Sequence, residues 1–311
     1  MKKFFTLLLA VISTMTAFAQ TEPAIELQAE VDGNTRTLTI GLGVEGTVQI
    51  DWGNGEKVTS ENIPVYDGWN QVNVSGTVSG DGKVKIYGDN IVYFECSSRV
   101  DGAQVLSLDV MKATALKDLT ANTNKLTAID LTKNTELTKL TINNNQLTNI
   151  DISKCTKLTT LDITNNLLTA IDITKNQALQ TLRIGQNKLA GELDLSTNPT
   201  IKLVYAQTNE LASVKIGNNT ASKPTFSFNE NKLTSFDATG IKDAGNATLF
   251  LISNQLTEIT LPSTKMKSIN ISKNNFTIAT LPATSVAKFF TYAPQNDYVI
   301  AESYKVGDVL D

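Results

Sequence analysis

Residues 116–131 read Leu-Lys-Asp-Leu-Thr-Ala-Asn-Thr-Asn-Lys-Leu-Thr-Ala-Ile-Asp-Leu, and the same arrangement returns every 21 residues in the next copies. An asparagine marks each copy, and the spacings between these asparagines are 21, 21, 21, 22, 22, 23 and 20 residues. The set is Asn124, Asn145, Asn166, Asn187, Asn209, Asn231, Asn254 and Asn274. Self-similarity at a fixed period of 20 to 50 residues indicates a solenoid, in which each repeat forms one coil.

The residue types within one repeat predict how a coil is built. Apolar residues alternate, as at Leu140 and Ile142, so they point inward from a short strand while the residues between them face outward. Coils stacked about 4.8 Å apart bury a continuous core that no single coil can form. The asparagine follows the strand, where the backbone bends inward and loses its sheet partners. Its amide offers a donor and an acceptor there, so we expect a structural ladder of asparagines.

The pattern L-x-x-L-x-L-x-x-N-x-L is the leucine-rich-repeat signature. Residues 146–154, Gln-Leu-Thr-Asn-Ile-Asp-Ile-Ser-Lys, make the chain resemble the internalin-like secreted leucine-rich-repeat proteins of Gram-negative anaerobic bacteria. The resemblance covers about residues 91–281 and implies adhesion or recognition at a surface. Many of those relatives carry cysteine at the inward strand position, which here is held mostly by isoleucine, so only Cys96 matches that variant.

We therefore expect a leucine-rich-repeat solenoid of about nine coils, with short parallel strands on its concave face, over residues 91–283. A small all-β capping domain is expected over residues 20–90, where apolar residues alternate between glycine-rich turns. Its stretch Asp-Trp-Gly-Asn-Gly at 51–55 is similar to the hairpin of polycystic-kidney-disease-type sandwich domains. Residues 291–295, Thr-Tyr-Ala-Pro-Gln, resemble the exit motif of the repeat family. Residues 284–311 are accordingly a C-terminal cap or the start of a further domain.

The first 19 residues read as a secretory signal peptide: Lys2 and Lys3 precede an apolar stretch, and Ala17-Phe18-Ala19 supplies the cleavage site. We expect a mature protein that starts at Gln20 and is secreted or displayed at the cell surface. No other segment is long and apolar enough to be a transmembrane helix. Removing two lysines changes the balance from 27 basic and 31 acidic residues to 25 and 31, a net charge of −6. Because no concentrated basic region remains, a nucleic-acid partner is not expected.

The sequence offers little for catalysis. It contains no histidine, no nucleophile motif and no phosphate-binding glycine loop, so we expect neither an enzyme nor a cofactor. The repeat register separates Cys96 from Cys155 by about two coils, which predicts buried free thiols and no disulfide. A column of aspartates one coil apart could bind calcium, but a lysine three residues later in three of the four coils favours simple charge compensation. These aspartates are Asp130, Asp151, Asp172 and Asp194.

The outward strand positions lie six, four and two residues before each ladder asparagine. They are small and polar in the N-terminal coils, whereas large apolar side chains occur in the later ones. Such groups on a solvated sheet indicate an interface. The candidate binding residues are Arg183, Leu203, Tyr205, Phe250 and Ile252. In the apolar run 249–252, either Phe250 and Ile252 or Leu249 and Leu251 could face outward.

We expect a non-catalytic binding or adhesion protein whose ligand is a protein or glycan at a host or bacterial surface. The alternative is a structural spacer that holds a separate C-terminal domain away from the cell surface. An enzyme accessory domain is a weaker alternative. The oligomeric state is not predicted by any of these features.

Overall fold

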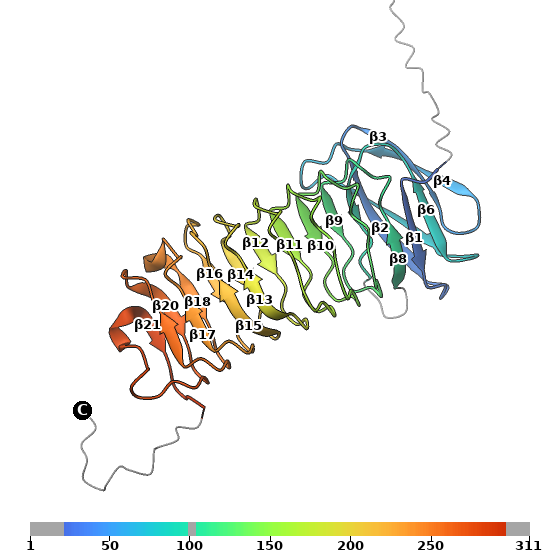
Figure 1. Ribbon diagram of the computed structural model, residues 1–311. Helices are drawn as coiled ribbons and strands as arrows, with labels where there is room; N and C mark the ends of the chain where they lie inside the picture. Colours follow the sequence, from blue (N-terminus) through green and yellow to red (C-terminus); the bar gives the residue numbers. More distant parts are fainter. Residues whose placement is uncertain (1–21, 99–103, 297–311) are drawn as a thin grey trace, which may run out of the picture.

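A computed structural model describes residues 22–98 and 104–296, and it confirms the predicted leucine-rich-repeat solenoid. The short strands of successive coils form one long sheet that runs through the molecule, and an all-β domain lies at its N-terminal end (Figure 1). This sheet has twelve strands in the order β21-β20-β18-β16-β14-β12-β11-β10-β9-β7-β2-β5. The expected signal peptide lies outside the described residues.

The N-terminal domain is built from two sheets. One is five-stranded, with the order β4-β3-β6-β1-β8. The other is the end of the long sheet, where β2 pairs antiparallel with both β5 and β7. The strands are β1 (Ile25–Ala29), β2 (Thr35–Leu42), β3 (Gly46–Asp51), β4 (Lys57–Ile63), β5 (Val72–Thr77), β6 (Lys83–Tyr87), β7 (Ile91–Glu95) and β8 (Val105–Asp109). Because β7 pairs with β2 on one side and β9 on the other, the domain continues the repeat sheet instead of resting against it.

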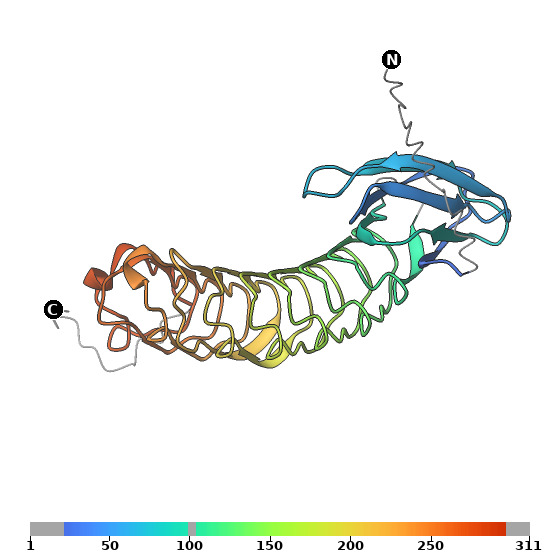
Figure 2. The ribbon, with the colours of Figure 1, turned by 90° about the horizontal axis from the view of Figure 1, so that it is seen from above.

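From β7 onward, each coil adds one parallel strand. The strands of the long sheet are β9 (Asp118–Thr120), β10 (Lys139–Thr141), β11 (Thr160–Asp162), β12 (Thr181–Arg183), β14 (Leu203–Tyr205), β16 (Thr225–Ser227), β18 (Thr248–Phe250), β20 (Met266–Asn270) and β21 (Ala287–Thr291). Their middle residues stay in register from Leu119 to Ile269, and these side chains are almost fully buried. The resulting stack is curved (Figure 2).

The opposite side of the stack carries little regular structure. Two short parallel sheets occur there, one formed by β13 (Ala190–Asp194) and β15 (Glu210–Lys215), the other by β17 (Ser235–Asp237) and β19 (Glu258–Thr260). Two 3-10 turns, η1 (Ala244–Asn246) and η2 (Thr284–Val286), complete the described elements. No helix among the described residues has the length and apolar character needed to cross a membrane.

A few residues after each repeat strand, the chain passes through a left-handed residue that directly precedes the ladder asparagine. The preceding residue has a φ of 54° to 58° in most coils, for example at Asn165, and this turns the chain inward. The asparagine then bonds to two coils at once. At Asn166, Oδ1 accepts from the Leu147 N–H (3.0 Å), while Nδ2 donates to the carbonyls of Ile142 and Ile163, each at 3.1 Å.

All eight predicted asparagines make this set of bonds, and all but the half-buried Asn187 are buried. Sequence reasoning missed a glutamine that makes part of this set. Gln295 stands 21 residues after Asn274; its Oε1 accepts from the Asn274 N–H (3.2 Å), and its Nε2 donates to the Ile271 carbonyl (3.1 Å). The strand β21 before it pairs with β20. The repeat sheet thus continues past residue 283, the boundary expected from the sequence.

Both cysteines are buried free thiols. Burial raises the pKa of Cys96 to about 12 and that of Cys155 to about 11. Cys155 occupies a position that asparagine holds in neighbouring coils, and its Sγ lies 3.6 Å from the Asn134 carbonyl. Asn176 makes the corresponding bond to the Cys155 carbonyl at 2.9 Å.

Candidate functional site

The candidate binding surface is the outward side of the long sheet. Register aligns its middle column one residue per coil, so Asp162, Arg183, Tyr205, Ser227 and Phe250 follow one another from β11 to β18. Adjacent residues in this column are about 4.8 Å apart at the backbone, because they lie on hydrogen-bonded strands. A ligand on this face would therefore meet side chains from several coils at once.

The five candidate residues lie on three of these coils, and all are partly exposed. Arg183 and Tyr205 are direct neighbours, and the guanidinium carbon lies 5.8 Å from the centre of the Tyr205 ring. Leu203 begins the same strand as Tyr205. Phe250 ends β18, and Ile252 follows it on the same face; the Ile252 N–H donates to Asn229 Oδ1 at 2.8 Å. These residues form the C-terminal patch.

The alternative left open for residues 249–252 is resolved. Leu249 and Leu251 are completely buried, whereas Phe250 and Ile252 are partly exposed. Leu249 pairs with Phe226 and Ile269, which are themselves core residues, so the register of the neighbouring coils decides which pair faces inward. The extra residues in the 23-residue interval between Asn231 and Asn254 lie outside the paired strands β16 and β18.

Ser227 interrupts the aromatic residues of the C-terminal patch. It separates Tyr205 from Phe250 in the middle column and is only 6% exposed, because its larger neighbours shield it. Sequence reasoning missed one further residue, Phe289 on β21, which is 58% exposed. Its position 21 residues after Ser268, its partner on β20, is the sequence feature that could have identified it as an outward residue.

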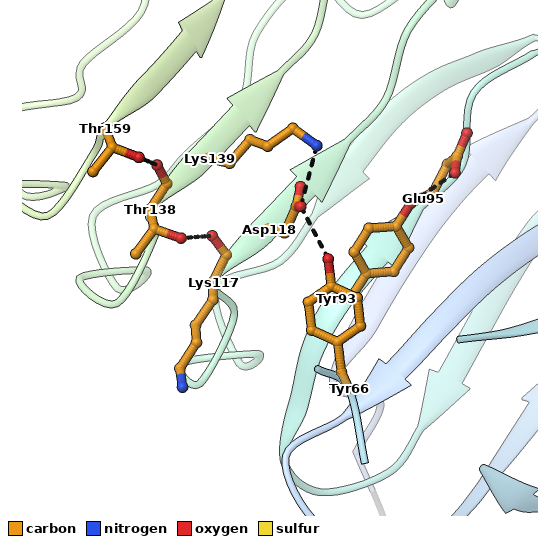
Figure 3. Close-up of polar contacts among 8 residues, drawn as sticks. All are labelled: Tyr66, Tyr93, Glu95, Lys117, Asp118, Thr138, Lys139 and Thr159. Carbon is orange, nitrogen blue, oxygen red and sulfur yellow. Dashed lines mark hydrogen bonds and ion pairs between the residues drawn. The ribbon is translucent and has the colours of Figure 1, made fainter. Parts of the chain in front are cut away.

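A different, polar arrangement occurs at the N-terminal end of the face, where the segment between β4 and β5 meets the first repeat strands (Figure 3). The Tyr66 ring stacks on Tyr93, with 4.8 Å between ring centres. The Tyr66 hydroxyl donates to Asp118 Oδ2, and Lys139 Nζ reaches the same oxygen, each at 3.3 Å. The Tyr93 hydroxyl donates to Glu95 (2.8 Å). We call these five residues the N-terminal clasp.

Burial controls the ionisation of the clasp. The Asp118 side chain is 10% exposed, and desolvation raises the pKa of its carboxyl group despite the opposing effect of Lys139. Its second oxygen, Oδ1, is buried without a hydrogen-bond partner. Burial and the neighbouring carboxylate raise the pKa of Tyr66 to about 12, so this phenol remains a donor at neutral pH.

The aspartate column has a structural use. Each carboxylate accepts a hydrogen bond from the backbone N–H two residues later, as in the bond from Thr132 to Asp130 (2.9 Å). Hydrogen bonds to Thr132 lower the pKa of Asp130, and corresponding bonds act on the other three aspartates. Within residues 22–98 and 104–296, no cluster of three potential metal ligands occurs.

A comparison with known protein families identifies part of the repeat region. Residues 135–175 match the family model for leucine-rich repeats in two copies. The chain contains leucine-rich repeats. No curated protein sequence matches it.

Several solved structures are similar. A leucine-rich-repeat protein from Leptospira interrogans shares 21% identity over 54% of this chain and 46% of its own, with a TM-score of 0.47. The functional domain of InlJ from Listeria monocytogenes, which includes a cysteine ladder, shares 24% identity over 65% of this chain and 53% of its own (TM-score 0.36). The internalin InlF from the same species shares 18% identity over 66% and 67% (TM-score 0.42). The chain spans about half the length of the first two.

Proposed function

We propose that this protein is a non-catalytic binding protein that recognises a protein partner through the outward face of its repeat sheet, centred on the C-terminal patch. The carrying observation is that Tyr205 and Phe250 are aligned on that face and partly exposed, although a solvated strand needs no aromatic residue there. Leu203 and Ile252 widen the apolar area, and Arg183 borders it.

The composition of the patch matches what dominates protein–protein affinity. Tyrosine and arginine are enriched among residues whose truncation costs most binding energy, and such residues cluster with apolar neighbours that exclude water. The buried ladder beneath the patch holds its backbone in place, so less conformational entropy is lost on binding. A spacer that only separates two domains would have no use for this cluster, and the same holds for an accessory domain without a ligand.

The test is binding by the mature chain, residues 20–311, to panels of host-surface and bacterial-surface proteins and to a glycan array. Each ligand found is titrated against Tyr205→Ala and Phe250→Ser. We expect a protein ligand whose affinity falls about 30-fold in each variant, the effect of losing about 2 kcal/mol at a central contact. The matched control is Thr141→Ala, which lies in the same column on β10 and should bind as tightly as the wild type. A protein ligand bound equally well by both patch variants would contradict the proposal.

We also propose that the protein is exported and acts in the extracellular space or at the cell surface. The support is the order of basic, apolar and small residues in 1–19. In a Gram-negative host, the intact mass of the protein outside the cytoplasm should correspond to a chain beginning at Gln20. An exported protein that retains Met1 would show that no cleavage takes place.

A further inference from the structure

Trp69 is the most exposed large apolar residue of the described chain, at 87% exposure. It lies in residues 64–71, between β4 and β5, in the N-terminal domain. The only other tryptophan, Trp52, is 6% exposed and packs against Gly76, where an added Cβ would lie 2.2 Å from the indole. One indole thus has a structural place in the core, while the other has none.

The segment that carries Trp69 is firmly held, so the exposure is not that of a loose end. The Tyr66 N–H donates to the Leu42 carbonyl (2.8 Å), and the Tyr66 side chain belongs to the N-terminal clasp. Asp67 then closes the turn: its Oδ1 accepts from the backbone N–H of Trp69 and of Asn70, each at 3.0 Å. Because the backbone of this turn is already ordered, a ligand that covers Trp69 has only the side chain to immobilise.

The surroundings of Trp69 indicate the chemistry of that ligand. Residues 64–71 contain no lysine or arginine, and their one carboxylate, Asp67, already bonds within the turn through both oxygens. The remaining polar side chains are the amides of Asn70 and Gln71. The one negative charge of this segment is already compensated by hydrogen bonds within the turn, one of them from Asn70 Nδ2 (2.9 Å), so the ring and the amide of Gln71 suit a ligand that is neutral and rich in hydroxyl groups.

We propose that Trp69 is the stacking platform of a second binding site, which takes a neutral glycan. One face of a sugar ring presents C–H groups that pack on an aromatic ring, while the hydroxyl groups at its rim bond to amides.

A protein interface is a poorer fit at this point. Standard protein interfaces bury about 800 Å² on each partner around a cluster of apolar residues. The other strongly exposed aliphatic side chains at this segment among the described residues are Val65, at 47%, and Val44, at 58%, which lies two residues after Leu42, the bridge partner of Val65. A single flat ring matches a sugar unit better than it matches the core of such an interface.

The two tryptophans allow a direct test, because only Trp69 is open to solvent. The mature chain is titrated with soluble neutral polysaccharides, namely laminarin, mannan, arabinoxylan, galactan and amylopectin, while tryptophan emission and its quenching by acrylamide are recorded. We expect at least one polysaccharide to shift the emission to shorter wavelength and to protect the exposed indole from quenching. Heparin and polygalacturonate, which are anionic, should do neither.

Variants separate this site from the C-terminal patch. In affinity electrophoresis with the active polysaccharide, Trp69→Ala should bind at least tenfold more weakly at an unchanged melting temperature, and Trp69→Tyr should retain most of the affinity. Phe250→Ser is the matched control and should bind normally. The proposal is overturned if none of the neutral polysaccharides alters the emission, if only the anionic ones do, or if Trp69→Ala binds as tightly as the wild type. These outcomes do not depend on whether a protein partner binds the C-terminal patch.

Discussion

The ladder asparagines show how one side chain stabilises a bend that the backbone cannot stabilise alone. Where each strand ends, the N–H and carbonyl groups of two adjacent coils point into the core and lack sheet partners. Asn166 supplies one acceptor and two donors to these groups while being only 5% exposed. An apolar side chain of similar size would fit the space and leave three buried polar groups unpaired.

Asn166→Leu should therefore lower the free energy of unfolding by about 1 to 3 kcal/mol. Urea denaturation followed by circular dichroism measures the change. Asn143→Leu is the control, because Asn143 lies on the outward face and is partly exposed, so its replacement should cost less than about 0.5 kcal/mol. Equal losses in the two variants would show that the ladder position has no special role.

At the scale of elements, the segment between β4 and β5 is attached to the repeat sheet through the N-terminal clasp. Its central acceptor is Asp118, whose ionised form loses hydration on burial and keeps one oxygen unpaired. Lys139 is 46% exposed at the side chain, so the ion pair is weakened by solvent. The Asp118 carboxylate thus stabilises the fold as the acceptor for Tyr66, whereas the burial of its negative charge destabilises it.

Asp118→Asn should raise the free energy of unfolding at pH 7. Asparagine keeps an acceptor for the Tyr66 hydroxyl and removes the charge whose burial raises the carboxyl pKa. A raised pKa means that the folded state binds a proton at a pH where the unfolded state, near its ordinary value of 3.8, does not. The cost of ionising Asp118 is present above the folded pKa and is relieved as the pH falls through it.

The gain in Asp118→Asn should accordingly shrink as the pH falls toward 3.8, and urea denaturation at a series of pH values measures it. Tyr66→Phe serves as the companion variant and should be destabilised by about 1 kcal/mol at pH 7, because it removes the donor to the carboxylate. A loss of stability in Asp118→Asn at pH 7 that is independent of pH would contradict this account.

At the scale of the whole molecule, the N-terminal domain and the repeats share one sheet and one hydrophobic core. β7 would otherwise be an open edge, and its inward residue Phe94 is fully buried with Ile40 of β2 as its partner. On the other layer, β8 joins the five-stranded sheet by pairing with β1. The cap therefore covers both the unpaired edge and the first inward residues.

A chain that begins at Ile91 should aggregate, because it exposes the edge of β7 together with the core around Phe94. Size-exclusion chromatography with light scattering should show aggregates that the chain with its cap does not form, and the sharp thermal transition should be lost. A chain ending at Asn296 is the control, since it retains the cap and every described strand. A monodisperse, cooperatively folding chain from Ile91 would mean that the repeats need no cap.

The sequence by itself determined the repeat. A 21-residue period, alternating apolar residues and one asparagine per coil leave few folds that bury every leucine, because each coil is specified by its own residues and its nearest neighbours. The repeat pattern also predicted which strand residues face outward and where the candidate residues lie among them. It did not identify Gln295 at the end of the stack, because this glutamine donates to the Ile271 carbonyl as a ladder asparagine would but differs from asparagine in the sequence pattern.

Only the tertiary structure decided features that depend on contacts between distant segments. The orientation of residues 249–252 follows from register with β16 and β20, since either alternating pair is apolar enough to be core. The clasp joins Tyr66 to Asp118 across 52 positions, and nothing in the repeat period points to that contact. Trp69 is exposed and Trp52 is buried because different residues pack around each of them. The residue type alone does not reveal this difference.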